Sequence, residues 1–277
     1  MTAPSPEEIE SRLLGAQAAA DLAAKLTLDA FKSAPVAENK GDGAMFDPVT
    51  ETDRGAEKII REYLQSNFAE DGIVGEEFSD IAGHNDWSWC IDPIDGTRAF
   101  VAGVPVWSTL IGIFFQGEPV IGLIDHPALA ERYMGADGKA WKQTGAGVEP
   151  LKTRPCPRIN DAILSCTEPL AMFSQGQRAS YEMIRRTARF SRLGLDAYSY
   201  ALTASGRIDL VIEAQLKPYD IAALIPVIEG AGGKITDWHG GPAHKIGNDG
   251  GAVVCGGDPE LLEQVYPYLK RAMDTKI

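Results

Sequence analysis

Residues 87–100 read WSWCIDPIDGTRAF, and this stretch decides the fold that we expect. Its first five residues are mostly aromatic or apolar, which predicts a buried strand that ends at residue 91. Asp92 follows that strand directly. Pro93 restricts the backbone, so Asp92 and Asp95 are held around a tight turn. The stretch therefore predicts two acids at the end of a strand.

The residues that follow the turn favour an anion site. Gly96 lets the chain approach a ligand closely, and Thr97 opens a short predicted helix that runs through Phe100. Free backbone amides at the start of a helix bind anions. Two carboxylates beside an anion make chemical sense if hard cations bridge them to a phosphate group. The alternative is that Asp92 and Asp95 only shape the turn and cap the helix.

Three further acidic patches occur along the chain. They are Thr50-Glu51-Thr52-Asp53, Gly75-Glu76-Glu77 and Tyr219-Asp220. Each has a structural explanation when it is taken alone. Thr52 or Asp53 would cap a helix that runs to about Phe68, Asp220 would cap an apolar helix, and the two glutamates would be solvated acids. No histidine pair, P-loop or EF-hand spacing offers another site for a metal or a phosphate.

Capping residues and apolar periodicity predict the elements of the first half of the chain. A capping box at Ser5 begins a helix that ends before Pro35. Its apolar side contains Ile9, Leu13, Leu22 and Leu26. Residues 36–51 are expected to form a loop or a hairpin. Consecutive strands are then expected at 72–75, 87–91, 109–115, 119–125 and 132–135.

Gly and Pro residues concentrate at 145–158, where we place a boundary between two lobes. Beyond it, strands and helices alternate. Strands are expected at 162–166, 208–213, 234–237 and 252–255, and helices at 175–187, 196–205 and 221–231. Consecutive strands in one half and alternation in the other predict a layered α+β protein.

The composition limits the classes of function. The chain has 277 residues, 44% of them hydrophobic and 23% charged, which is enough for one large domain or two packed lobes. The net charge of −13 disfavours binding to nucleic acid or to anionic lipid. The first ten residues are acidic where a signal peptide is basic, and no apolar run is long enough to span a membrane. We expect a soluble, cytoplasmic protein with reduced thiols.

Taken together, the acidic patches resemble the inositol monophosphatase superfamily. The resemblance rests on DPVTETD, GEE, IDPIDGTRAFVAGVP and YDIAALIPVIEGAGG, in that order, and extends from about residue 8 to residue 265. It implies a layered αβαβα fold of the sugar-phosphatase type. Residues 1–150 would form a lobe with most of the metal ligands, and residues 151–277 a lobe with Asp220. The active site would lie between them.

The resemblance also implies roles for individual residues. Metal ligands would be Glu76, Asp92, Asp95, Asp220 and the carbonyl oxygen of Ile94, and they would bind two or three Mg²⁺ ions. Glu76 and Thr97 would orient and activate the attacking water, with Asp53 behind the metal ligands. Asp95 and the amides of Gly96 and Thr97 would hold the phosphate group. The implied activity is metal-assisted hydrolysis of a phosphate monoester.

Local features resemble the histidinol-phosphatase branch of this superfamily. They are RAFVAGVPVW at 98–107, GLDAYSY at 194–200 and LKPYD at 216–220. The implied substrate is L-histidinol phosphate, an intermediate of histidine biosynthesis, and its contacts would be Arg98, Gly194, Asp196 and Glu213. An acid there would pair with the amine of histidinol.

Other readings remain open. The substrate would instead be an inositol monophosphate or a 3′(2′),5′-bisphosphate nucleotide, or the chain would be a non-catalytic regulator that keeps the fold. For Asp196 and Glu213 the structural alternatives are a helix cap and a surface acid at the end of a strand. The resemblance further implies a homodimer.

Overall fold

The computed structural model describes residues 3–33, 38–39, 48–247 and 250–274. Its helices are α1 (Pro6–Lys32), α2 (Glu51–Asn67), α3 (Thr97–Val101), α4 (Pro169–Met172), α5 (Gln175–Thr187), α6 (Tyr198–Ala204), α7 (Pro218–Ile221), α8 (Leu224–Gly230) and α9 (Pro259–Asp274). Its strands are β1 (Glu38–Asn39), β2 (Pro48–Val49), β3 (Gly72–Gly75), β4 (Trp87–Asp95), β5 (Ser108–Phe115), β6 (Glu118–His126), β7 (Glu131–Ala136), β8 (Lys139–Thr144), β9 (Gly147–Pro150), β10 (Ile163–Cys166), β11 (Phe190–Leu193), β12 (Leu210–Leu216), β13 (Lys234–Asp237) and β14 (Gly251–Gly256).

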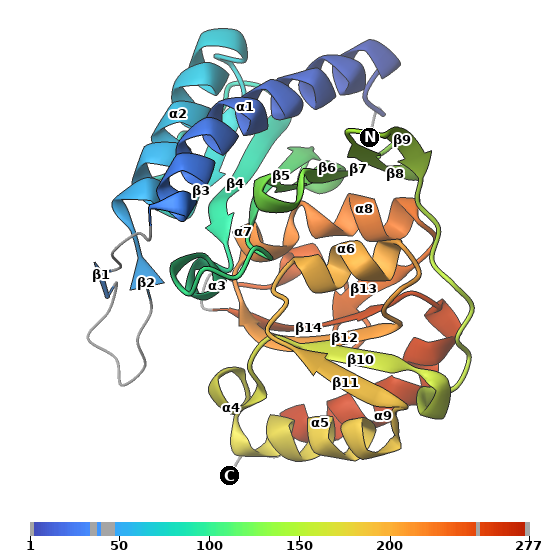
Figure 1. The fold of residues 1–277 in the computed structure, drawn as a ribbon. Coiled ribbons are helices and arrows are strands. Elements are labelled where there is room, and N and C mark those ends of the chain that lie inside the picture. Colours follow the sequence, from blue (N-terminus) through green and yellow to red (C-terminus); the bar gives the residue numbers. More distant parts are fainter. Residues whose placement is uncertain (1–2, 34–37, 40–47, 248–249, 275–277) are drawn as a thin grey trace.

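These elements form five layers (Figure 1). Helices α1 and α2 cover the outer face of a sheet in which the described strands run in the order β3-β4-β5-β6-β7-β8-β9. Helices α6, α7 and α8 lie between this sheet and a second one, which has the order β11-β10-β12-β14-β13. Helices α5 and α9 pack together on the far face of the second sheet. The predicted layered α+β fold is confirmed.

The first helix begins as predicted, but its buried side differs from the prediction. Ser5 and Glu8 form a capping box at the start of α1. The fully buried apolar side chains are alanines at 16, 19, 20 and 23, and Leu22 remains 37% exposed. The prediction for Leu22 was therefore wrong, because α1 packs through small side chains that let α2 and the sheet approach closely. Across the described residues, no helix combines the length and the apolar character needed to cross a membrane.

The second helix begins earlier than predicted. Its N-cap is Thr50 and not Thr52 or Asp53. The Thr50 hydroxyl accepts the amide of Thr52, and the Thr50 amide donates to Asp53 Oδ2 at 2.9 Å. Asp53 is thus the third residue of α2, and the capping box fixes its carboxylate. Upstream of the helix, β1 and β2 pair antiparallel, as a hairpin would, while residues 40–47 of the predicted loop or hairpin lie outside the described residues.

The strands of the first sheet match the prediction except at two places. β4 does not end at Ile91 but continues to Asp95, with an irregularity between Asp92 and Asp95. The sequence analysis also missed β8 and β9, since the polar and Gly-rich stretch 139–150 lacks the apolar alternation of a strand. β9 is an exposed strand at the edge of the sheet, where Glu149 and Pro150 are tolerated.

The second sheet contains the four predicted strands and one more, β11. Helix α5 has the predicted bounds, but no element was predicted for α9. The helix predicted at 221–231 is divided into α7 and α8, and α7 already begins at Pro218. The chain passes from the first sheet to the second over residues 151–162, where a single 3₁₀ turn is the regular structure described. The division into lobes at residue 150 stays a prediction.

A row of glycines sets the position of α7 and α8. Gly112, Gly122 and Gly135 lie side by side on β5, β6 and β7 and are buried. A Cβ atom at Gly112 would lie 2.5 Å from Cβ of Ala222. At Gly122 it would overlap the carbonyl oxygen of Ala223, and at Gly135 the backbone of Pro226 in α8. Because these three glycines have no side chains, α7, α8 and the two residues between them pack directly on the backbone of the sheet.

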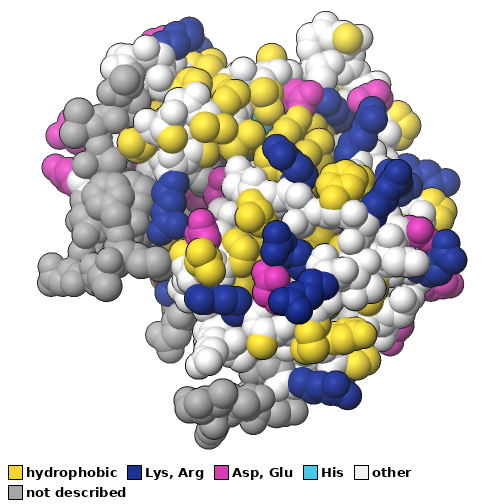
Figure 2. All heavy atoms as spheres, turned by 60° about the horizontal axis from the view of Figure 1, so that its bottom comes forward, with side chains coloured by type: hydrophobic (Ala, Val, Ile, Leu, Met, Phe, Trp, Pro, Cys, Tyr) yellow, Lys and Arg dark blue, Asp and Glu magenta, His cyan; other side chains and the backbone are white. Residues whose placement is uncertain are grey.

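The negative charge is not spread evenly over the surface. Figure 2 shows a face on which Lys and Arg side chains are prominent between apolar ones, and it is the face on the side of α4 and α5 in Figure 1. Arg185, Arg186, Arg189 and Arg192 are exposed on and just after α5. The absence of a nucleic-acid partner, which was inferred from the net charge, stays a prediction. The homodimer implied by the resemblance also stays a prediction.

The glycine row yields a prediction on stability. Gly122→Ala should lower the free energy of unfolding by about 1–3 kcal/mol, because the new methyl group would overlap a backbone carbonyl that cannot rotate away. Urea denaturation measures this. Gly145→Ala is the matched control, since its Cβ would meet no atom within 4 Å and should change stability by less than about 0.5 kcal/mol. Equal stability of the two variants would contradict the role of the row.

Candidate active site

The irregularity in β4 brings two carboxylates to one point. Asp92 pairs with Leu110 and Asp95 with Ser108, so the strand gains an extra residue between them. Pro93 lacks an amide hydrogen and interrupts the ladder there. The amide of Ile94 donates to Asp92 Oδ1 at 3.0 Å and fixes that side chain. Asp92 is only 2% exposed, so it lies inside the strand and not beyond its end as predicted.

The chain then turns into α3. Gly96 caps this helix with a φ of 78°, a left-handed conformation that favours glycine. Thr97, the first helical residue, donates its hydroxyl to the carbonyl of Ile94 at 3.0 Å and lies 3.4 Å from Asp53 Oδ1. The structure therefore brings the predicted site residues Asp53, Ile94 and Thr97 together from two distant segments.

Asp220 approaches the same point from the second half of the chain. It is the third residue of α7 and not its cap, and its Oδ2 accepts the amide of Lys217 at 2.6 Å. Because α7 packs against β4 and β5, Asp220 lies beside the strand that carries Asp92 and Asp95. One carboxylate oxygen from each of the three lies within 4.8 Å of the others.

The electrostatics of this cluster call for a cation. Burial raises the pKa of Asp92 well above its usual range. The negative charges of Glu76, Asp95 and Asp220 raise this pKa further. Burial raises the pKa of Asp220 to about 7, with Glu76 contributing and the Lys217 amide opposing. Clustered carboxylate oxygens are the donors that hard divalent cations such as Mg²⁺ prefer. The residues present therefore fit such an ion.

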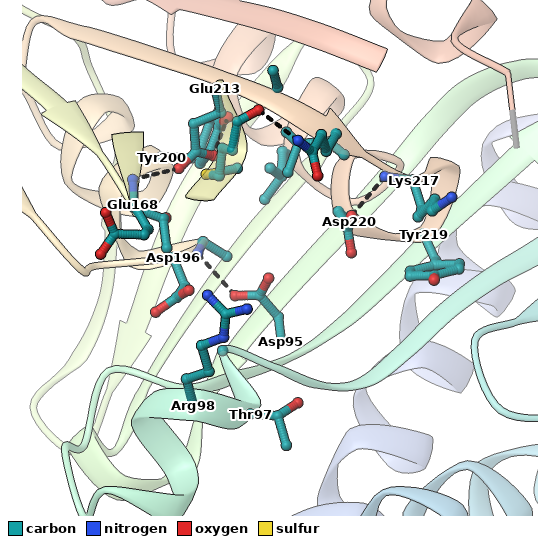
Figure 3. A pocket seen from close by; sticks show the side chains of 18 of the residues that line it. Asp95, Thr97, Arg98, Glu168, Asp196, Tyr200, Glu213, Lys217, Tyr219 and Asp220 are labelled. Carbon is teal, nitrogen blue, oxygen red and sulfur yellow. Dashed lines mark hydrogen bonds between the residues drawn. The ribbon is translucent and has the colours of Figure 1, made fainter. Parts of the chain in front are cut away.

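A cavity of about 400 Å³ opens beside the cluster (Figure 3). Residues 95–98 and Glu76 line one side, and Lys217, Tyr219 and Asp220 another. Figure 3 shows Glu168, Asp196, Tyr200 and Glu213 on the remaining side, contributed by the second half of the chain. The cavity thus has a cluster of metal-type ligands and, beside it, a second group of acids.

Asp196 connects the two halves of the site. It has a φ of 48° and precedes Ala197, which is the N-cap residue of α6, so Asp196 is not the helix cap. The Ala197 amide donates to Asp95 Oδ2 at 2.8 Å, and the Asp196 side chain packs against the Cα of Gly96. Burial raises the pKa of Asp196 to about 6, and the positive charge of Arg98 opposes that rise. Figure 3 shows the Arg98 guanidinium directed toward both carboxylates.

Glu213 is a buried residue of the sheet and not a surface acid at the end of a strand. It lies within β12 and is 2% exposed. Its two oxygens accept the Thr167 amide and the Tyr200 hydroxyl, each at 2.9 Å. Burial raises its pKa to about 7, and Asp196 adds to the rise, while the Thr167 and Tyr200 hydrogen bonds lower it.

One predicted contact is not brought into the cavity, and one lining acid was missed. Gly194 is exposed after β11 and is not among the lining residues, so its predicted substrate contact has no support from its position. Glu168 lines the cavity, although the sequence analysis did not single it out. It follows the predicted strand 162–166 closely, which is the same signal that marked Asp92.

The comparisons with known proteins identify the family. The family model for the inositol monophosphatase family matches residues 8–274. The chain belongs to the inositol monophosphatase family. The solved structure of an inositol monophosphatase from Zymomonas mobilis superposes with a TM-score of 0.80 at 37% identity, covering 96% of this chain and all of that one.

Two curated relatives place the chain among phosphatases. It is 40% identical over 230 residues to bifunctional phosphatase IMPL2, chloroplastic, from Arabidopsis thaliana, which covers 80% of this chain and 65% of that protein, less than two-thirds of its length. It is 35% identical over 223 residues to a histidinol-phosphatase of Chlorobaculum parvum, which covers 80% and 83%. The family depends on metal ions and acts on small phosphate monoesters, and the chain is a phosphatase.

The raised pKa values predict how metal and pH interact. The pKa values of Asp196, Glu213 and Asp220 are about 6, 7 and 7, above the value near 4 of an unfolded carboxyl. The folded state therefore holds extra protons between about pH 4 and 7. Without metal, this contribution to stability should fall as the pH rises through that window. Since cations compete with these protons, Mg²⁺ should raise the melting temperature more at about pH 8 than at about pH 5.

Thermal unfolding in EDTA and in Mg²⁺ at both pH values measures this. His126 acts in the opposite direction. Burial lowers its pKa to about 4, so its contribution to the free energy of unfolding is lost as the pH falls below about 6.5. Asp220→Asn isolates the cluster and should flatten the EDTA profile at its alkaline end. An equal effect of Mg²⁺ at both pH values would contradict the metal site.

Proposed function

We propose that the protein is a Mg²⁺-dependent phosphatase that hydrolyses L-histidinol phosphate to L-histidinol and phosphate. The observation that carries this proposal is the second group of acids in the cavity, Glu168, Asp196 and Glu213, which lies beside the metal-type cluster and is not part of it. Histidinol carries an ammonium group on its carbon chain. Inositol is a neutral polyol, so its hydroxyls can donate hydrogen bonds to these carboxylates but carry no charge that compensates them.

The proposed metal ligands are the carboxylates of Glu76, Asp92, Asp95 and Asp220 and the carbonyl oxygen of Ile94. Two or three Mg²⁺ ions bound there would supply Lewis-acid stabilisation of the charge on the phosphate and leaving oxygens and would acidify a bound water. The carbonyl of Ile94 already accepts the Thr97 hydroxyl, which orients this oxygen toward the turn.

The chain itself would orient the reactants. The amides of Gly96 and Thr97, at the start of α3, would hold the phosphate oxygens together with Arg98. The Thr97 hydroxyl donates to the Ile94 carbonyl, which leaves its oxygen able to accept a hydrogen bond from the attacking water. Glu76 would take up a proton from this water, and Asp53 would keep Thr97 in place. The water oxygen would bond to phosphorus, the ester bond would break, and the leaving oxygen would gain a proton from solvent, to which Glu76 returns its own.

The acids of the second group would bind the leaving group. Burial raises the pKa values of Asp196 and Glu213, and the positive charge of Arg98 offsets the rise at Asp196 only in part. A substrate ammonium would supply the missing charge and form charge-assisted hydrogen bonds. Three relatives named histidinol-phosphatase, at 33–35% identity, support this substrate. Relatives named inositol-1-monophosphatase have 31–32% identity and keep that substrate as the alternative.

A substrate panel tests the proposal. With Mg²⁺, kcat/KM should be at least about tenfold higher for L-histidinol phosphate than for inositol 1-phosphate or a 3′,5′-bisphosphate nucleotide, since one charge-assisted hydrogen bond is worth about 1.5–3 kcal/mol. Asp196→Asn should lower kcat/KM for histidinol phosphate about tenfold to a hundredfold. p-Nitrophenyl phosphate has no amine, so its hydrolysis should change little.

A second pair of variants separates charge from structure. Glu213→Gln removes the charge and also one of the two acceptors that hold Thr167 and Tyr200. Tyr200→Phe removes the Tyr200 hydrogen bond and keeps the charge. Only Glu213→Gln should weaken histidinol phosphate selectively. A parallel loss of both substrates in both variants would assign Glu213 to the fold, and a higher kcat/KM for inositol 1-phosphate would overturn the histidinol proposal.

A further inference from the structure

A buried ion pair on α2 faces the segment that carries Glu76. Glu57 and Arg61 are one helical turn apart, and Arg61 Nε lies 2.7 Å from Glu57 Oε1. Their side chains are 0% and 8% exposed. Neither residue lines the cavity, whereas Glu76 does. A pair so deeply buried is costly to desolvate unless its remaining polar atoms are bonded.

Those remaining atoms bond the backbone just after Glu76. Arg61 Nη1 donates to the carbonyl of Ser79 at 3.1 Å, and Nη2 to the carbonyl of Phe78 at 3.0 Å. Glu57 Oε2 accepts the amide of Glu77 at 2.7 Å. Residues 76–80 belong to no helix or strand, so these bonds replace a regular ladder. Three consecutive residues are thus fixed by one ion pair.

The pair also contacts the residue before Glu76. A Cβ atom at Gly75 would overlap Oε1 of Glu57 and would lie 2.6 Å from Nη2 of Arg61. Glycine at this position therefore allows the ion pair to lie directly against the end of β3. The backbone on both sides of Glu76 is held by the same two side chains.

We propose that the Glu57–Arg61 pair is a positioning device that holds the carboxylate of Glu76 at the acidic cluster. The inference rests on the role proposed above for Glu76. Glu57 and Arg61 are positioning residues, since they act through the backbone and do not contact the substrate.

Repulsion within the cluster explains why such a device is needed. Glu76 faces Asp92 and Asp220, and all three carry negative charge when they are ionised. A glutamate on a segment without regular structure would move away from the other two. The planar guanidinium and the carboxylate form directional bonds, which a buried apolar pair of the same volume could not supply. The ion pair therefore provides position, beyond any contribution to stability.

The test compares two identical substitutions in the full-length protein. Arg61→Lys keeps the charge but loses the fork that joins Glu57, Phe78 and Ser79. We expect kcat for p-nitrophenyl phosphate to fall about tenfold to a hundredfold, with KM within about twofold, and the Mg²⁺ concentration for half-maximal activation to rise. Arg132→Lys is the matched control, because Arg132 forms a comparably buried pair with Asp125 that does not line the cavity. It should lower the melting temperature without changing kcat or the Mg²⁺ requirement.

Two further variants make each outcome decisive. Gly75→Ala displaces the pair without removing a charge and should reproduce the loss of kcat even if Arg61→Lys does not fold. Glu76→Gln measures how far kcat and the Mg²⁺ requirement depend on the charge of Glu76. If Glu76→Gln is fully active, the proposed role of Glu76 fails, whatever the pair does. If Glu76→Gln is inactive while the folded Arg61→Lys or Gly75→Ala variant matches Arg132→Lys in kcat and Mg²⁺ requirement, the positioning inference is overturned.

Discussion

The structure depends on a constraint of charge: carboxylate oxygens of Asp92, which is buried, and of Asp95 and Asp220, which are partly buried, lie within 4.8 Å of one another. Like charges in such a site raise one another's pKa and oppose folding until a cation compensates them. Every element that brings them together must therefore be fixed by other interactions. The irregular turn of β4 fixes the first two residues, and the cap of α7 fixes the third.

The glycine row and the buried ion pair each fix a segment that carries one of the clustered acids. Gly112, Gly122 and Gly135 let the α7–α8 backbone rest on the first sheet, which determines how close Asp220 comes to β4. Glu57 and Arg61 bond the backbone that follows Glu76. The phosphatase site is thus assembled from segments far apart in the sequence, and each segment has its own fixing interaction. In the proposed function, a second set of acids beside the metal ligands, Glu168, Asp196 and Glu213, would recognise the leaving group.

The sequence predicted what local chemistry determines. The turn of Asp92-Pro93-Ile94-Asp95-Gly96 is specified by its own residues, and its place in the site followed from the resemblance. The burial of Glu213 could not be predicted locally, because its environment comes from Thr167 and Tyr200, which only the assembled sheet and α6 bring to it. Thr50 was missed as a cap because three possible capping residues stand within four positions. The break between α7 and α8 has a local cause that the prediction overlooked, since Pro226 has no amide hydrogen to donate to the carbonyl of Ala222.

The most direct test of the account is to locate the metal. Crystals soaked in Mn²⁺, which replaces Mg²⁺ at oxygen sites and scatters anomalously, should show anomalous density among Asp92, Asp95 and Asp220. The density should disappear in Asp92→Asn, which keeps the shape of the side chain and removes its charge. Mn²⁺ bound only elsewhere, or bound equally in Asp92→Asn, would contradict the claim that this carboxylate cluster is the metal site of the phosphatase.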